Sequence, residues 1–86
     1  MSKTTGTLEF NFVTGRPAMF DSLGGHVDDF HCGNTLEIRL DGQWITCRAE
    51  LGWGADGRNY WYLCNNQGWS RRLSEIDLPA PIRVGR

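Results

Sequence analysis

The sequence predicts an all-β domain, a small barrel of about five short antiparallel strands with at most one helical turn. Eleven glycines and several turn dipeptides divide the chain into short segments in which apolar and polar residues alternate, as they do along half-buried strands. The dipeptide Asp41-Gly42 separates two such segments, and it is the strongest short-range signal of a β-hairpin. A chain of 86 residues is long enough for one core and too short for two. We therefore expect a single domain over residues 1–86.

Each candidate strand is a short segment bounded by turn residues. In the first, Leu8, Phe10 and Phe12 share one face, because side chains alternate along a strand. The last is expected to pair with the first, which would close the barrel and hide both edges of the sheet. Residues 26–33 are expected to form an irregular loop. The predicted strands are 7–12, 18–20, 35–40, 43–50, 59–64 and 82–84.

The Asp41-Gly42 loop fixes the register of the strands on either side of it, because a two-residue type I′ turn leaves its neighbours directly opposite each other. One face of this hairpin is then apolar and the other is polar. Trp44 lies on the polar face and is predicted to point outward. The expected pairs are Ile38 with Ile45 and Leu36 with Cys47 on the apolar face, and Arg39 with Trp44, Glu37 with Thr46 and Thr35 with Arg48 on the polar face.

The facing of residues 59–64 depends on the glycine-rich loop before them. A tight turn at Asp56-Gly57 would bury Tyr62, whereas a bulge in that loop would bury Trp61 and Leu63. We favour the bulge, because a buried tyrosine hydroxyl needs a hydrogen-bond partner and a leucine does not.

One helical turn is expected after this strand. Trp69, Leu73 and Ile76 recur at helical spacing, which predicts a single turn of α-helix or 3₁₀-helix. The prolines of residues 78–81 then end it.

The charge balance argues against a general attraction to nucleic acids or membranes. The net charge is -1, so the whole-molecule field does not favour phosphate backbones or anionic lipids. The distribution is uneven, because residues 44–86 hold six arginines, four acids and all four tryptophans. The chain has no apolar run of about 18 residues, and residues 1–30 lack the pattern of a signal peptide. We therefore expect a soluble cytoplasmic protein with no membrane partner.

Histidine and cysteine supply the ligand types of a zinc site without its usual spacing. None of them forms a C-x₂-C pair, the spacing that makes such a prediction specific. Cys47 is better explained as a small hydrophobe on the apolar face of its strand. An odd number of scattered cysteines also predicts reduced thiols. The residues in question are His26, His31, Cys32, Cys47 and Cys64.

A catalytic nucleophile is not expected either. His31 and Cys32 follow Asp28 and Asp29 closely in the sequence. Adjacent side chains of an extended segment point apart, however, which disfavours a pairing of nucleophile and base. We expect no catalytic residue, no metal and no cofactor. A small metal-dependent enzyme that uses His31 and the cysteines is the third of our hypotheses.

An outward Trp44 beside arginines has the composition of a protein interface, because Trp, Tyr and Arg are over-represented in interface hot spots. The alternative is that Trp44 is covered by the N-terminal segment or by the loop at 51–58. A non-enzymatic protein-binding module is our first hypothesis, and a homodimer through the same face is left open. The predicted partner-binding residues are Trp44, Arg39, Arg48, Trp53 and Arg58.

A nucleic-acid-binding accessory protein is the second hypothesis. Arg71 and Arg72 form a basic cluster that Arg83 and Arg86 could join. Arginines beside aromatic rings are the ingredients of single-strand binding, in which bases stack on the rings and arginines follow the backbone. Two nearby acids make the signal weak.

A family signature runs through four segments, at 31–38, 42–45, 48–50 and 61–63, with the pattern HCG-x-x-LE-[IV], G-x-W and WYL. In these segments the chain resembles a family of small bacterial proteins of unknown function. Those proteins look SH3-like and are encountered mostly in phages, plasmids and conjugative elements. The chain departs from the pattern in a longer 51–58 loop and in residues 65–77, so a partner surface built there would be particular to this protein.

The resemblance implies an SH3-like barrel and carries over no catalytic residue. It also bears on the partner. Small proteins of mobile elements often inhibit host defence systems, CRISPR effectors among them, or act in maintenance of the element, which is an analogy of biology rather than of residues. The resemblance therefore implies a protein partner. The most specific version of this hypothesis is that the partner is a host defence nuclease.

Overall fold

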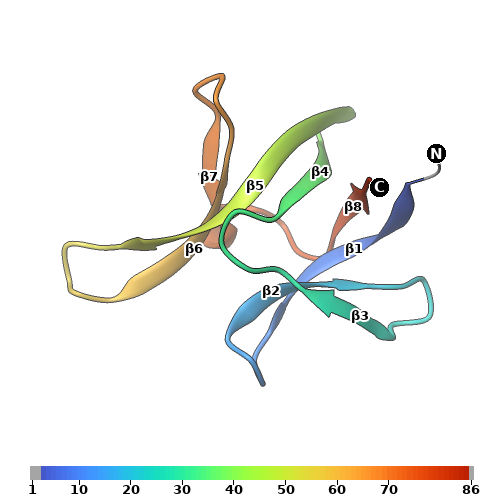
Figure 1. The fold of residues 1–86 in the computed structure, drawn as a ribbon, viewed down its shortest axis with the longest axis horizontal. Helices are drawn as coiled ribbons and strands as arrows, with labels where there is room; N and C mark the ends of the chain where they lie inside the picture. The colour runs from blue at the N-terminus through green and yellow to red at the C-terminus, as the bar shows by residue number, and fades with distance from the viewer. Residues whose placement is uncertain (1–2, 86) are drawn as a thin grey trace.

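The computed structural model describes residues 3–85, which form one antiparallel sheet of eight strands in the order β3-β2-β1-β8-β4-β5-β6-β7 (Figure 1). A single 3₁₀ turn is the other regular element of this part of the chain. The predicted all-β class is confirmed. The elements are β1 (Thr4–Asn11), β2 (Arg16–Phe20), β3 (His26–Asp29), β4 (Thr35–Leu40), β5 (Gln43–Trp53), β6 (Asn59–Cys64), β7 (Ser70–Arg72), η1 (Leu73–Glu75) and β8 (Ala80–Val84).

The predicted count of about five strands was too low, because the predicted set does not include β3 and β7. Both are the edge strands of the sheet. Residues 26–33 were expected to be a loop, but their first half is β3. Nearly all residues of β3 and all of β7 are exposed. A strand with no face in the core has no apolar alternation, so its sequence carries no signal of this kind.

The predicted register of the central hairpin is confirmed at all five pairs. The backbone φ angles of Asp41 and Gly42 are 52° and 77°, as a type I′ turn requires at both of its central residues. Ile38 and Leu36 are therefore buried, while Arg39 lies on the outer face.

The favoured facing of β6 is also confirmed, although no bulge produces it. Leu63 pairs with Ala49 and is buried, whereas Tyr62 lies on the other face opposite Glu50. The register is unbroken along the whole hairpin. The facing follows instead from a five-residue loop, 54–58, which is closed by a hydrogen bond of 2.8 Å from the Gly54 N–H to the Arg58 carbonyl.

The sheet has two parts, β3-β2-β1-β8 and β4-β5-β6-β7, which join where β8 pairs with β4 and which enclose the core. The largest fully buried aliphatic side chains come from β1, β4, β6 and β8, so the sheet must coil around them. As predicted, β8 pairs with β1. This pairing does not hide the edges, because β8 also pairs with β4 and the sheet ends at β3 and β7. These four buried residues are Leu8, Ile38, Leu63 and Ile82.

The single helical turn predicted from Trp69, Leu73 and Ile76 is present as the 3₁₀ turn η1. Only η1 is helical, and β7 occupies the residues before it. The Glu75 carboxylate accepts a hydrogen bond of 2.8 Å from the Arg72 N–H and thereby caps the turn. Within residues 3–85, no helix is long and apolar enough to cross a membrane.

Candidate functional site: an aromatic groove between two hairpins

Trp44 lies on the outer face of the sheet between two arginines. The Cζ atoms of Arg39 and Arg83 lie 5.8 and 4.1 Å from the centre of its ring. Arg83 comes from β8, and Glu37 holds it through two hydrogen bonds of 3.0 and 3.1 Å. We call these four residues the Trp44 cluster. Trp44 is half-buried under these contacts, and the charge of Arg83 is already balanced within the molecule.

Glu37 is the acid of this cluster, and Lys3 pairs with it in addition to Arg83. Hydrogen bonds from Arg83 first and Lys3 second lower the pKa of Glu37 from its ordinary 4.5 to about 2, although partial desolvation opposes them. Such bonds stabilise the ionised carboxylate. The cluster therefore joins β8, β4 and β5 through a carboxylate that is ionised at neutral pH.

We predict that Glu37→Gln changes how stability depends on pH. The folded state has the lower pKa, so the stability contributed by the ionised Glu37 is complete above pH 4.5 and is lost as the pH falls toward about 2. Wild type should thus be more stable than the variant at neutral pH and should lose that advantage between these two values. Urea unfolding across this range measures the difference, with Glu9→Gln as the matched control. Parallel profiles for wild type and Glu37→Gln would contradict the prediction.

The residues predicted to bind a partner do not form one patch. Trp44 and Trp53 lie near the two ends of β5, a strand of 11 residues, which spans roughly 30 Å at about 3.3 Å per residue. Arg48 lies between them and forms an ion pair of 3.1 Å with Glu50. Arg58 belongs to the exposed loop beside Trp53. The set is therefore divided along the hairpin of β5 and β6.

The residues of the predicted basic cluster are also separated. Arg71 and Arg72 lie on β7, whereas Arg83 lies on β8, and three strands stand between them in the sheet. Arg72 stacks on Tyr60, with its Cζ 3.9 Å from the ring centre. Arg86 lies outside the described residues. The described arginines thus do not form one basic surface.

The histidines and cysteines do not gather into a metal site either. Within residues 3–85, no group of three or more His, Cys, Asp or Glu is placed to hold a metal ion. The three cysteines are free thiols, and burial raises the pKa of Cys47 to about 12, which suppresses the reactive thiolate. The histidine that contacts a carboxylate is His26, whose Nε2 lies 2.9 Å from Asp29 Oδ1.

An aromatic groove, which none of these predictions included, lies where the β1–β2 hairpin meets the β5–β6 hairpin. It consists of two adjoining hollows, of about 280 and 430 Å³, that share Phe10, Tyr60 and Trp61. The Trp61 indole N–H donates a hydrogen bond of 2.9 Å to the Gly15 carbonyl, which joins the tip of one hairpin to the other. The other lining residues are Phe12, Leu73, Ser74 and Leu78 in the first hollow, and Thr14, Gly15, Arg16, Leu51 and Asn59 in the second.

Two large, exposed aromatic side chains flank this groove. Phe12 is 88% exposed and lines the first hollow. Trp53 is 70% exposed, and it lies two residues beyond Leu51 on the same face of β5. Figure 1 shows the β5–β6 hairpin, which carries Trp53, extending away from the body of the sheet. Exposed aromatic groups beside a groove that is itself lined by aromatic residues are typical of interaction surfaces.

The prediction that Phe12 shares a face of the first strand with Leu8 and Phe10 was wrong, because Phe12 is exposed and lies beyond the end of β1. The strand ends at Asn11, because the Asn11 side chain accepts a hydrogen bond of 3.0 Å from the Val13 N–H and begins a turn. The sequence does contain a signal of this exposure. Phe12 and Val13 directly precede Thr14 and Gly15, so two large apolar residues lie within a turn.

The fold and this surface define a small single-sheet all-β domain with an exposed aromatic groove. The chain belongs to the family described as domain of unknown function DUF5348, whose model matches residues 6–80. This range includes every residue that lines the groove, as well as Trp53. No curated protein and no solved structure matches the chain.

Proposed function

We propose that this chain is a non-enzymatic, SH3-like module that binds a protein partner through its aromatic groove. The exposure of two aromatic side chains carries the proposal: Phe12, which lines the first hollow, and Trp53, which pairs with Asn59 of the second. Large exposed aromatic side chains beside a groove are typical of a surface that binds a partner. The SH3-like assignment is supported by the all-antiparallel sheet and by the pairing of its terminal strands, β1 and β8.

The lining of the groove favours a protein over a nucleic acid. Its first hollow is lined by aromatic and aliphatic residues with one serine, and Arg16 is the only cationic residue among those that line either hollow. Arg16 stands over Trp61, with its Cζ 5.6 Å from the ring centre. A single-stranded nucleic acid needs a track of cations as well as rings. Apolar side chains of a partner are the better match.

The aromatic residues also suit a binding role energetically. Phe10 and Phe12 pack edge to face, with ring centres 4.9 Å apart, and Trp61 is held by its bond to Gly15. Rigid aromatic side chains offer a large contact area and lose little entropy on binding. A partner segment that contacts Phe12, Trp61 and Trp53 would therefore concentrate its binding energy there.

The test is recovery of partners from the source cell by tagged wild type and by a double variant, Phe12→Ser with Trp53→Ser. Both side chains are exposed, so the double variant should fold, which its circular dichroism and urea unfolding would show. The matched control is Leu23→Ser, since Leu23 is 94% exposed and lies outside the groove. A protein recovered by wild type and control should be lost with the double variant. With the purified partner, its affinity should fall at least about tenfold, as for interface aromatic hot spots.

Recovery of the same proteins by wild type and the double variant would overturn the proposal for this groove. A parallel Trp44→Ala variant then tests the face of Trp44, Arg39 and Arg48, which the sequence predicts to bind a partner. The second hypothesis is tested by titration with single-stranded DNA and RNA over a series of salt concentrations. Binding whose affinity falls steeply with salt would favour a nucleic-acid partner over a protein partner.

Resemblance to phage and plasmid proteins supports a more specific form of this proposal. In that form the cytoplasmic partner is a host defence nuclease, such as a CRISPR effector, and the module inhibits it by binding. The recovered partner should then have nuclease activity that falls when wild type is added and persists with the double variant. Recovery of a partner that is not a nuclease would contradict this specific form, while the proposal of a protein-binding module would still hold.

A further inference from the structure

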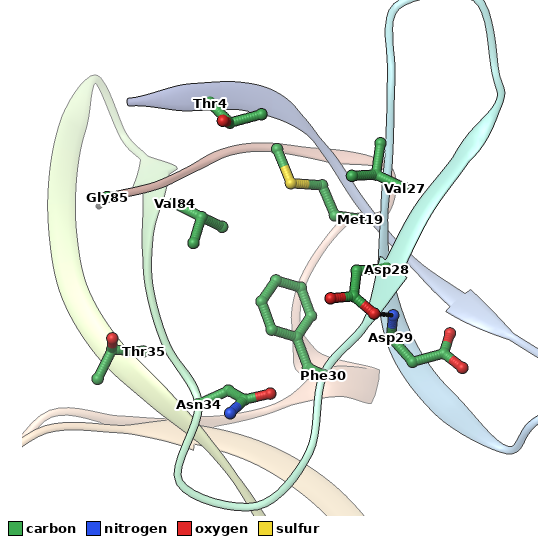
Figure 2. Close-up of a pocket in the computed structure, with 10 residues that line it drawn as sticks. All are labelled: Thr4, Met19, Val27, Asp28, Asp29, Phe30, Asn34, Thr35, Val84 and Gly85. Atoms are coloured by element: carbon green, nitrogen blue, oxygen red, sulfur yellow. Dashed lines mark hydrogen bonds between the residues drawn. The ribbon is translucent and has the colours of Figure 1, made fainter. Parts of the chain in front are cut away.

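A cavity lies at the end of the sheet away from the aromatic groove, where β1 and β4 begin and β8 ends (Figure 2). Its volume is about 330 Å³, close to the lower limit of the roughly 300–1,000 Å³ typical of ligand pockets. Met19, Phe30 and Val84 give it an apolar surface, and Asp28 places a carboxylate on its wall. A site of this size suits a side chain better than a large ligand.

The Asp28 carboxylate is held in place and points into the cavity. Asp28 pairs with Met19 across β2 and β3, so its side chain lies on the same face as the buried Met19. One carboxylate oxygen accepts a hydrogen bond of 2.9 Å from the Asp29 N–H, and the other points toward the cavity beside Phe30 (Figure 2). An anionic oxygen is thus set against an apolar surface.

The nearby charged groups are engaged elsewhere. Asp29 points away from the cavity (Figure 2), and its carboxylate contacts His26 at 2.9 Å and Asn11 at 3.2 Å. Lys3 pairs with Glu37. Among residues 3–85, no lysine, arginine or histidine forms an ion pair with Asp28. Asp28 therefore offers a carboxylate without a counter-ion beside an apolar surface, and a cation brought by a partner would supply one.

We propose that this cavity binds a lysine or arginine side chain of a protein partner. Such a side chain combines an aliphatic stem with a cationic tip. The stem would contact Met19, Phe30 and Val84, while the tip would meet the free oxygen of Asp28. This site is distinct from the groove, because Thr4 on the cavity and Phe10 on the groove lie toward opposite ends of the eight-residue strand β1, roughly 20 Å apart at about 3.3 Å per residue. The proposal does not depend on the groove.

Asp28 also has a simpler role to be distinguished from binding. An acid that points inward from an edge strand hinders edge-to-edge pairing between molecules, and β3 is an edge strand. That role requires no ligand. Binding of a defined cationic probe therefore separates the two roles.

The experiment uses three blocked tripeptides as probes: Gly-Lys-Gly, Gly-Arg-Gly and Gly-norleucine-Gly, of which the last has an aliphatic side chain without a charge. Each is titrated into the ¹⁵N-labelled full chain, and amide shifts are followed by NMR. The lysine or arginine peptide should shift the signals of Asp28, Phe30 and Asn34. Asp28→Asn should weaken its binding about tenfold, as expected for loss of a charge-assisted hydrogen bond. Asparagine keeps the acceptor for the Asp29 N–H, so the fold of β3 should be unchanged.

Asp41→Asn is the matched control, since it makes the same chemical change in an exposed turn outside the cavity and asparagine tolerates positive φ. Its affinity for the cationic peptide should equal that of wild type. Equal binding of the norleucine peptide, or equal affinity of Asp28→Asn and wild type, would overturn the proposal. So would the absence of shifts at the cavity at millimolar peptide, or shifts confined to the aromatic groove.

Discussion

Replacing Ile38 by alanine is expected to lower the free energy of unfolding by about 2 to 5 kcal/mol, the range for large-to-small changes of fully buried aliphatic residues. Ile38 is completely buried. It pairs with Ile45 on β5 and with Ile82 on β8, so it lies where the two parts of the sheet join. At Ile38, β4 is paired with β5 on one side and with β8 on the other. Because the backbone is held on both sides, the neighbours of Ile38 have little freedom to fill the space that its side chain leaves.

Urea unfolding of wild type, Ile38→Ala and Ile38→Val measures this effect. The valine variant removes one methylene and should lose only about 0.5 to 1.5 kcal/mol. Val27→Ala is the surface control and should stay within about 0.5 kcal/mol of wild type, because Val27 is 46% exposed on the edge strand β3. An alanine variant no less stable than the valine variant would show that this junction repacks.

Gly6→Ala is expected to destabilise the fold by about 1 to 3 kcal/mol or more, as overpacking of a core does. Gly6 lies in β1 between β2 and β8. A Cβ atom there would lie 2.4 Å from the Phe20 carbonyl oxygen and 3.0 Å from Met19 Cε. The Met19 side chain can rotate away, but the carbonyl oxygen is part of the backbone of β2. The strands themselves would have to move.

A double variant distinguishes these two contacts. If the carbonyl contact dominates, Gly6→Ala should cost as much in a Met19→Ala background as in wild type, measured by urea unfolding. Full rescue in that background would place the conflict at the Met19 side chain instead. Gly85→Ala is the control, since its Cβ would meet Lys3 at 3.8 Å, an ordinary van der Waals distance.

The central part of the fold could be predicted because local chemistry determines it. Asp41 and Gly42 set a turn geometry, and the register of β4 on β5 follows from it without reference to the rest of the chain. The facing of β6 was predictable for a similar reason, because leucine and tyrosine differ in what burial costs their polar atoms. The facing was predicted to arise from a bulge, but it arises from the five-residue length of the loop at 54–58.

The groove could not be predicted in the same way, because its walls come from distant parts of the chain. Phe10 reaches it from β1, Trp61 from β6, and Leu78 from the segment before β8. Their proximity depends on how the sheet coils, which no alternation pattern reports. Arg83 illustrates the same limit. Its sequence position suggested the basic cluster with Arg71, whereas the pairing of β8 with β4 places it over Trp44.

The hydrogen bond from the Trp61 indole to the Gly15 carbonyl has a consequence for the kinetics and thermodynamics of association. It fixes the β1–β2 tip against β6 in the unbound molecule, so the groove is pre-organised. The conformational entropy of bringing the two hairpins together is already lost during folding, so a ligand that binds the groove does not have to compensate for it. The two walls are then already in position at the first encounter, as in complexes whose interface backbone barely moves.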